Sequence, residues 1–193
     1  MSVATKKAVT ADQLFNVPNQ LTGLRLLLSL VLFALIACEY YLARTIVFVV
    51  AASTDWIDGY YARKYGQVTT LGRILDPFVD KIIICGTFIF LVPIPGANVS
   101  AWMAVVIVGR ELLVTALRSF LEGEGADFSA QMSGKLKMVF QCAAATLALA
   151  CLSTGERPTW LDWLLIATVW IAVLMTVYSG LEYVLKAWRL LRG

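Results

Sequence analysis

Long apolar stretches alternate along the chain with short breaks that are polar or rich in glycine and proline. An α-helix needs about 20 mainly apolar residues to cross the ~30 Å hydrocarbon core of a bilayer. Six stretches come close to that length or exceed it: Leu21–Cys38, Leu42–Ala62, Leu71–Val92, Val99–Leu121, Leu136–Ser153 and Trp160–Trp188. The pattern therefore predicts an all-α polytopic membrane protein with six transmembrane helices.

The breaks between the stretches carry residues that end helices. Pro93-Ile94-Pro95-Gly96 follows the third stretch, and Gly155-Glu156-Arg157-Pro158 follows the fifth. Mixed polar and apolar residues at 10–16 predict a short interfacial helix before the first crossing. We expect one membrane domain over residues 1–193, made of an N-terminal interfacial segment (1–20) and a six-helix bundle (21–188).

The composition supports the bilayer as solvent and narrows the chemistry. Of the 193 residues, 60% are hydrophobic and only 15% charged, with a mean hydropathy of +0.77. The net charge of +3 comes without a long basic run, which argues against nucleic acid as a partner. The chain has no histidine, and its four cysteines stand singly in apolar stretches. Histidine-based catalysis is therefore excluded, and a disulfide framework or thiolate metal site is disfavoured.

Lysine and arginine gather on one side of the predicted arrangement. The N-terminus, the second and fourth connections and the C-terminus are basic, whereas the other side offers only Arg44 and Arg157. By the positive-inside rule the basic side is cytoplasmic. Both termini are then expected in the cytoplasm.

Four aspartates lie at the cytoplasmic ends of the second and third stretches. Asp55 and Asp58 are three residues apart, and Asp76 and Asp80 are four apart, so each pair shares one helix face. A solvated charged loop is the plainer interpretation. However, the second pair precedes a strongly apolar run, and an aspartate at membrane depth costs about 2.5–3.5 kcal/mol. We therefore expect the four carboxylates to converge and to need counter-charge.

Hard divalent cations supply such counter-charge, because Mg²⁺ and Mn²⁺ prefer carboxylate and water oxygens. Two ions held by four carboxylates suit phosphoryl chemistry. Gly59 and Gly72 lie beside the aspartates, where a missing side chain admits either a phosphorylated group or a closely packed helix. The cluster thus predicts a two-metal site, with Mg²⁺ or Mn²⁺ as cofactor.

At these residues the chain resembles the CDP-alcohol phosphotransferase family. The segment from Asp55 to Asp80 carries the complete pattern D-x2-D-G-x2-A-R-x8-G-x3-D-x3-D. The resemblance implies a six-helix membrane enzyme, a homodimer, with a dinuclear metal site and a bound CDP group. It also implies an integral protein of the bacterial inner membrane, with its active site facing the cytoplasm.

The resemblance assigns roles to individual positions of the pattern. Asp55, Asp58, Asp76 and Asp80 are implied as metal ligands, Asp80 also as the catalytic general base, and Gly59, Ala62, Arg63 and Gly72 as the lining of the CDP pocket.

A second group of charged residues points to a phosphate-bearing acceptor. Arg110 lies inside the fourth stretch, where an unpaired guanidinium is costly, and Arg118 follows roughly on the same helix face. Lys135 and Lys137 begin the fifth stretch on the same side. Together these four cations suit a phosphate dianion. Alternatively, Arg110 pairs with Glu111 and the others are ordinary positive-inside residues.

Further segments resemble one branch of the family, the bacterial phosphatidylglycerophosphate synthases. They include Asn16–Arg25, Gly109-Arg110-Glu111 and Gly134-Lys135-Leu136-Lys137, whereas Met138 stands where a threonine is expected. This resemblance implies transfer of the phosphatidyl group from CDP-diacylglycerol, a membrane lipid, to sn-glycerol 3-phosphate.

Two alternatives stay open. Another acceptor of the same chemistry is inositol phosphate, serine or phosphatidylglycerol. A divalent-cation transporter would also use intramembrane carboxylates, but Arg63 would oppose cation entry.

Overall fold

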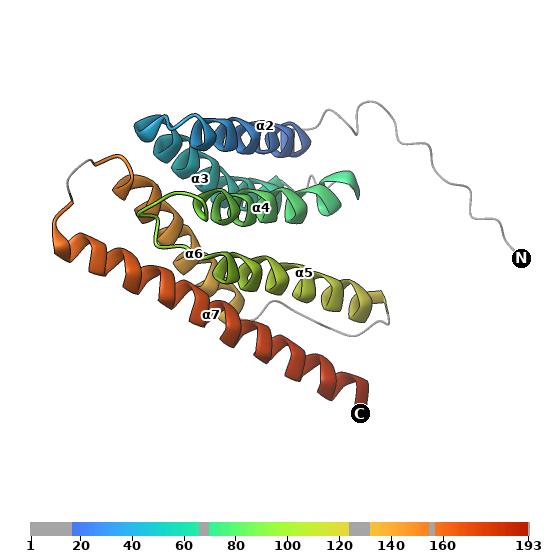
Figure 1. Cartoon of the computed structure of the whole chain (residues 1–193). Helices are drawn as coiled ribbons and strands as arrows, with labels where there is room; N and C mark the ends of the chain where they lie inside the picture. Colours follow the sequence, from blue (N-terminus) through green and yellow to red (C-terminus); the bar gives the residue numbers. More distant parts are fainter. Residues whose placement is uncertain (1–16, 66–69, 124–131, 155–156, 193) are drawn as a thin grey trace, which may run out of the picture.

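The computed structural model describes residues 17–65, 70–123, 132–154 and 157–192. This part of the chain is all helical apart from turns and short connections, and contains no strand. Its six helices are α2 (Val17–Ala37), α3 (Tyr41–Tyr65), α4 (Thr70–Leu91), α5 (Ala101–Gly123), α6 (Met132–Cys151) and α7 (Thr159–Arg192), shown in Figure 1. The all-α prediction is confirmed.

Each predicted stretch corresponds to one helix, with ends that shift by up to four residues. The largest shifts occur at the starts of α2 and α6 and at the end of α7. Helix α2 begins at Val17 because Pro18 is tolerated in a first turn, where its missing N–H needs no partner. The bundle therefore starts before residue 21, and the predicted interfacial helix at 10–16 lies outside the described residues.

A tight turn joins α2 to α3 and makes them antiparallel. Glu39 adopts a left-handed conformation with φ of 59°. The amide of Tyr40 donates to the carbonyl of Leu35, and that of Glu39 to the carbonyl of Ile36. This is the Schellman pattern, which satisfies the last carbonyls of a helix and stops it.

On the same side of the molecule, Arg157 ties two connections together. Its Nη1 donates to the Gly96 carbonyl at 3.1 Å and lies 3.6 Å from the Asp162 carboxylate. Gly96 has a φ of 82° and Arg157 lies directly against its α-carbon, so a side chain here would be strained and would clash. The connection from α4 to α5 is thereby fixed to the start of α7.

Helix α6 lies at the centre of the bundle. It contacts α7 most extensively and also packs against α3 and α4. Ala144, Ala145 and Ala148 are fully buried along it. Small side chains allow helices to approach closely, which is how apolar helices associate without a hydrophobic driving force.

Helix α2 covers α3 and α4 on the other side of the bundle. The rings of Phe33 on α2 and Phe90 on α4 stack with centroids 5.0 Å apart. A β-carbon added at Gly86 of α4 would collide with the Phe33 ring. Glycine at this position therefore permits the close contact between α2 and α4.

The outer surface is rich in exposed apolar side chains, among them Leu27, Leu30, Val105, Trp163 and Leu174. Within the described residues, two helices are long and apolar enough to cross a membrane, Met132–Cys151 and Thr159–Leu190. Three shorter apolar helical stretches are Thr22–Ala37, Leu42–Thr54 and Lys81–Leu91.

Charged residues explain why α5 does not pass the same test, whereas the described side chains cover only parts of α2, α3 and α4. The last turns of α3 and the first turns of α4 carry the aspartates and several cations, and α5 carries Arg110, Glu111 and Arg118. Two membrane-capable helices are thus established by length and composition. Six crossings remain a prediction.

The charged helix ends share one side of the bundle. In Figure 1 the start of α2, the start of α4 and the ends of α5 and α7 all lie to the right. The two helices that carry the aspartates, α3 and α4, are in contact. The bundle therefore brings the aspartate segments and the cation-bearing end of α5 to the same side.

Candidate functional site

The four aspartates occupy neighbouring helices. Asp55 and Asp58 lie in the second half of α3, and Asp76 and Asp80 lie in the first half of α4. Because both segments are helical, the members of each pair share a face, as the spacing predicts. The described side chains do not include those of Asp55, Asp58, Gly59, Ala62, Arg63, Gly72, Asp76 and Asp80. Their convergence stays a prediction.

The metal prediction depends on this donor set. Among the side chains that the structure describes, no group of three or more cysteine, aspartate or glutamate residues is placed to hold a metal ion. The four aspartates fall outside that comparison. Their chemistry fits Mg²⁺ or Mn²⁺, because these ions favour hard, anionic oxygen ligands.

Helices α5 and α6 bring Arg110 and Lys137 to one carboxylate. Arg110 Nη1 donates to Glu111 Oε1 at 3.2 Å, and Lys137 Nζ donates to the same oxygen. All three residues are buried, with at most 8% of each exposed. Burial of one acid between two cations lowers their mutual repulsion, so Arg110 and Lys137 can share an interior site.

Helix α7 completes the surroundings of Arg110. Arg110 Nη2 donates to Ser179 Oγ at 2.7 Å, and the Arg110 guanidinium carbon lies 5.5 Å from the centre of the Tyr183 ring. A β-carbon at Gly180 would lie 3.1 Å from Arg110 Cγ. Glycine at this point of α7 lets the arginine stem cross the helix backbone closely.

The other two predicted cations differ from each other. Arg118 lies about two helical turns after Arg110 on α5. Its Nη2 donates to the Tyr183 hydroxyl at 3.3 Å. Lys135 is exposed at the start of α6. The structure therefore gathers three of the four predicted cations. Below, the basic cluster means Arg110, Arg118 and Lys137 together with Glu111, Ser179 and Tyr183.

The basic cluster has more positive than negative charge among its described side chains, and some of its hydrogen-bond donors have no partner there. Among its described side chains, three cations stand against one carboxylate. The Nε atoms of Arg110 and Arg118 are buried without a hydrogen-bond partner among the described residues. A buried cation without full compensation is costly. An anion with several oxygens, such as a phosphate, is the ligand that such an arrangement accommodates best.

Sequence reasoning missed the contribution of α7. Ser179 and Tyr183 contact the arginines from more than 60 positions further along the chain. One turn deeper, Gln141 of α6 donates to Thr176 of α7 at 2.8 Å. The signal in the sequence is the spacing of Thr176, Ser179 and Tyr183, three and then four residues apart, which places polar groups on one face of an apolar helix.

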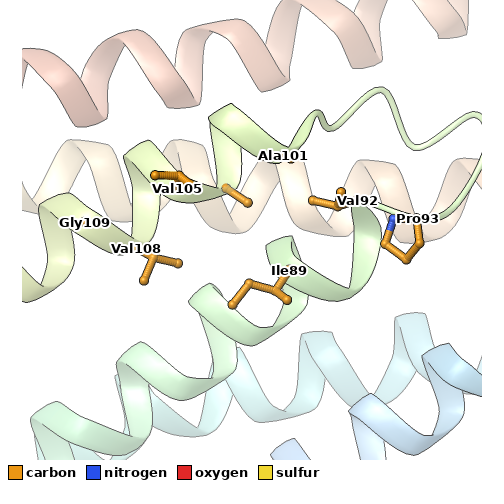
Figure 2. A pocket seen from close by; sticks show the side chains of 8 residues that line it. Ile89, Val92, Pro93, Ala101, Val105, Val108 and Gly109 are labelled. Atoms are coloured by element: carbon orange, nitrogen blue, oxygen red, sulfur yellow. The ribbon is translucent and has the colours of Figure 1, made fainter.

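A cavity between α4 and α5 has a different character. It is open to the outside, has a volume of about 480 Å³ and is lined by Ile89, Val92, Pro93, Ala101, Ala104, Val105, Val108 and Gly109, most of them labelled in Figure 2. It lies at the end of α4 remote from the aspartates. An apolar lining offers no ligand to a cation, so this cavity does not support an ion path.

Comparison with known proteins gives one consistent result. The family model described as CDP-alcohol phosphatidyltransferase matches residues 15–178. A Bacillus subtilis protein named CDP-diacylglycerol–glycerol-3-phosphate 3-phosphatidyltransferase is 36% identical over 196 residues, covering 93% of this chain and 98% of its own. A protein of the same name from Pseudomonas fluorescens is 34% identical, covering 90% of this chain and 90% of its own. One from Shigella flexneri is 33% identical, covering 90% of this chain and 95% of its own.

Proposed function

The chain belongs to the CDP-alcohol phosphatidyltransferase family, and we propose that it transfers the phosphatidyl group of CDP-diacylglycerol to sn-glycerol 3-phosphate. The products are CMP and phosphatidylglycerol phosphate. The observation that carries the choice of acceptor is the basic cluster, in which the buried Arg110 and Lys137 and the partly buried Arg118 come together from two helices. The names of the relatives agree with this choice.

The donor would bind at the aspartate segments of α3 and α4. Gly59, Ala62 and Gly72 would let the CDP group approach the helix backbones, and Arg63 would contact its phosphates. Asp55, Asp58, Asp76 and Asp80 would hold two divalent ions, Mg²⁺ or Mn²⁺. When bound, such ions neutralise phosphate charge and stabilise charge that develops during transfer.

The chemical step needs one base and one leaving group. Asp80 would accept the proton of the glycerol C1 hydroxyl, whose oxygen forms a bond to the phosphorus of the phosphatidyl group. The bond from that phosphorus to the oxygen of CMP breaks, and CMP leaves with the electron pair. The basic cluster would hold the acceptor phosphate and so fix the distance of the hydroxyl from the donor.

This reaction is tested by CMP release with a panel of acceptors. We expect turnover with glycerol 3-phosphate and little with glycerol, serine or unphosphorylated inositol, because these would leave the buried cations without their anion. Efficient use of serine would overturn the acceptor assignment. Turnover with inositol phosphate would support the phosphate site but identify a different acceptor. Turnover with phosphatidylglycerol as acceptor would indicate that the enzyme forms cardiolipin.

Removal of metal provides a separate prediction. Exhaustive EDTA treatment should abolish CMP release, and Mg²⁺ or Mn²⁺ should restore it, because the carboxylates alone repel a phosphate-bearing donor. Recovery with both ions is measured against a sample dialysed without chelator. Full activity after chelation would contradict the two-metal site.

We further propose six membrane crossings in a bacterial inner membrane, with both termini and the active site on the cytoplasmic side, and assembly as a homodimer. Among the described side chains, exposed apolar residues occur on each of the six helices, which is consistent with lipid or a second copy around the bundle. The separation of basic from non-basic connections supports the orientation.

Cysteine labelling tests this topology. Two exposed positions are replaced by cysteine in a background without the native cysteines: Gly123→Cys at the last residue of α5 and Thr154→Cys in the connection after α6. A β-carbon at Gly123 meets nothing within 4 Å, so the substitution is tolerated. We expect a membrane-impermeant maleimide to label Gly123→Cys only from the cytoplasm and Thr154→Cys only from outside. Labelling of both from one side would contradict the arrangement.

A further inference from the structure

Tyr183 lies between the two arginines of the basic cluster. Its ring centre is 5.5 Å from the guanidinium carbon of Arg110, and its hydroxyl accepts a hydrogen bond from Arg118 Nη2 at 3.3 Å. Only 1% of the residue is exposed. One side chain of α7 therefore contacts two cations of α5 with two different groups.

The two contacts serve like charges that would otherwise repel. The negative face of the Tyr183 ring attracts the Arg110 guanidinium, and the phenol oxygen accepts a hydrogen bond from the Arg118 guanidinium. A tyrosine held in the core has one rotamer, so both arginines gain a fixed neighbour. Tyr183 thereby limits the conformations that Arg110 and Arg118 can adopt before any ligand arrives.

The surrounding glycines leave room for this arrangement. A β-carbon at Gly134, at the start of α6, would lie 3.3 Å from the Tyr183 hydroxyl and 3.8 Å from Arg110 Nη2. Such a distance is tight enough to displace the hydroxyl by a few tenths of an ångström. The absence of a side chain at Gly134 is thus part of what lets Tyr183 reach Arg118.

We infer that Tyr183 is a positioning residue for the acceptor phosphate, acting through Arg118 by its hydroxyl and through Arg110 by its ring. The inference rests on the proposed function of the basic cluster. Tyr183 itself takes no part in the chemical step. Because Tyr183 already holds the two guanidinium groups in place, phosphate binding loses less side-chain conformational entropy.

The test is Tyr183→Phe, which keeps the ring against Arg110 and removes the hydroxyl that accepts from Arg118. The KM for glycerol 3-phosphate should rise about three- to ten-fold, less than on loss of a direct contact to the phosphate, because Tyr183 acts only through Arg118. The kcat and the KM for CDP-diacylglycerol should change less than two-fold. Tyr178→Phe, on the same helix but exposed, is the matched control and should behave as wild type.

A double-mutant cycle separates positioning from general packing. In an Arg118→Gln background, Tyr183→Phe should have no further effect on the KM for glycerol 3-phosphate, because its partner is gone. An additional rise of the same size would overturn the inference. Gly134→Ala, which pushes on the same hydroxyl from α6, should raise this KM in the same direction and serves if Tyr183→Phe does not fold.

The failures of the two proposals are distinguishable. If Arg118→Gln raises the KM for glycerol 3-phosphate and Tyr183→Phe does not, the acceptor site stands and the role of Tyr183 is wrong. If neither Arg110→Gln nor Arg118→Gln changes this KM, the acceptor site itself is wrong, and the inference falls with it.

Discussion

Asp80→Asn should lower the kcat for CMP release by at least about a hundred-fold while the protein stays folded. Asparagine keeps the shape of the side chain but can neither accept the hydroxyl proton nor supply a negative charge to a metal ion. Loss of a general base alone typically costs 10²–10⁴-fold, and weaker metal binding would add to that. The measurement is steady-state CMP release at saturating Mg²⁺ and both substrates.

A carboxylate remote from the site provides the control. Asp162→Asn removes a partly exposed acid at the start of α7, whose contact is with Arg157, and should leave kcat unchanged. Both variants should melt within a few degrees of wild type, since asparagine has nearly the same size and shape as aspartate. Near-normal turnover of Asp80→Asn would remove this residue from the mechanism, whatever the fate of the acceptor site.

Arg110→Gln should lower kcat/KM for glycerol 3-phosphate by about ten- to a hundred-fold. A charge-assisted hydrogen bond contributes about 1.5–3 kcal/mol, and glutamine has no charge and is two bonds shorter than arginine. The KM for CDP-diacylglycerol should stay within about two-fold, because the donor is expected at α3 and α4. Initial rates with each substrate varied in turn measure both constants.

Two further substitutions show whether burial in the cluster matters. Lys137→Gln removes the buried ammonium that shares Glu111 with Arg110 and should have an effect of similar size. Lys135→Gln, only two residues away but exposed, should have a much smaller one. Arg189→Gln, exposed near the end of α7, is the control for general loss of positive charge. Equal effects at Lys135 and Lys137 would indicate a diffuse attraction rather than a built site.

Stability needs separate attention for these buried variants. Removing one cation from the cluster changes the balance around Glu111, and an uncompensated buried charge is destabilising. The melting temperature of each variant should therefore be measured with and without saturating glycerol 3-phosphate. In wild type the ligand should raise it by mass action, and Arg110→Gln should lose most of that increase. A melting temperature that is lower but still rises normally with ligand would indicate a structural role only.

The sequence by itself determined the helices and the aspartate pairs. Each long apolar stretch became one helix, because only a helix satisfies its backbone groups within an apolar segment. The pairing of Asp55 with Asp58 and of Asp76 with Asp80 follows from helical spacing, which depends on neighbouring residues alone. The family assignment came from the same segment and is confirmed over residues 15–178.

Only the tertiary structure decided which cations share a site. Lys135 and Lys137 look equivalent in the sequence, yet the rotation of α6 buries one beside Glu111 and leaves the other exposed. Ser179 and Tyr183 reach the arginines because α7 packs along α5, a contact between segments some 65 to 69 positions apart. Helical periodicity fixes the face on which a side chain lies, but the neighbour of that face is set by how the helices pack, which no local pattern records.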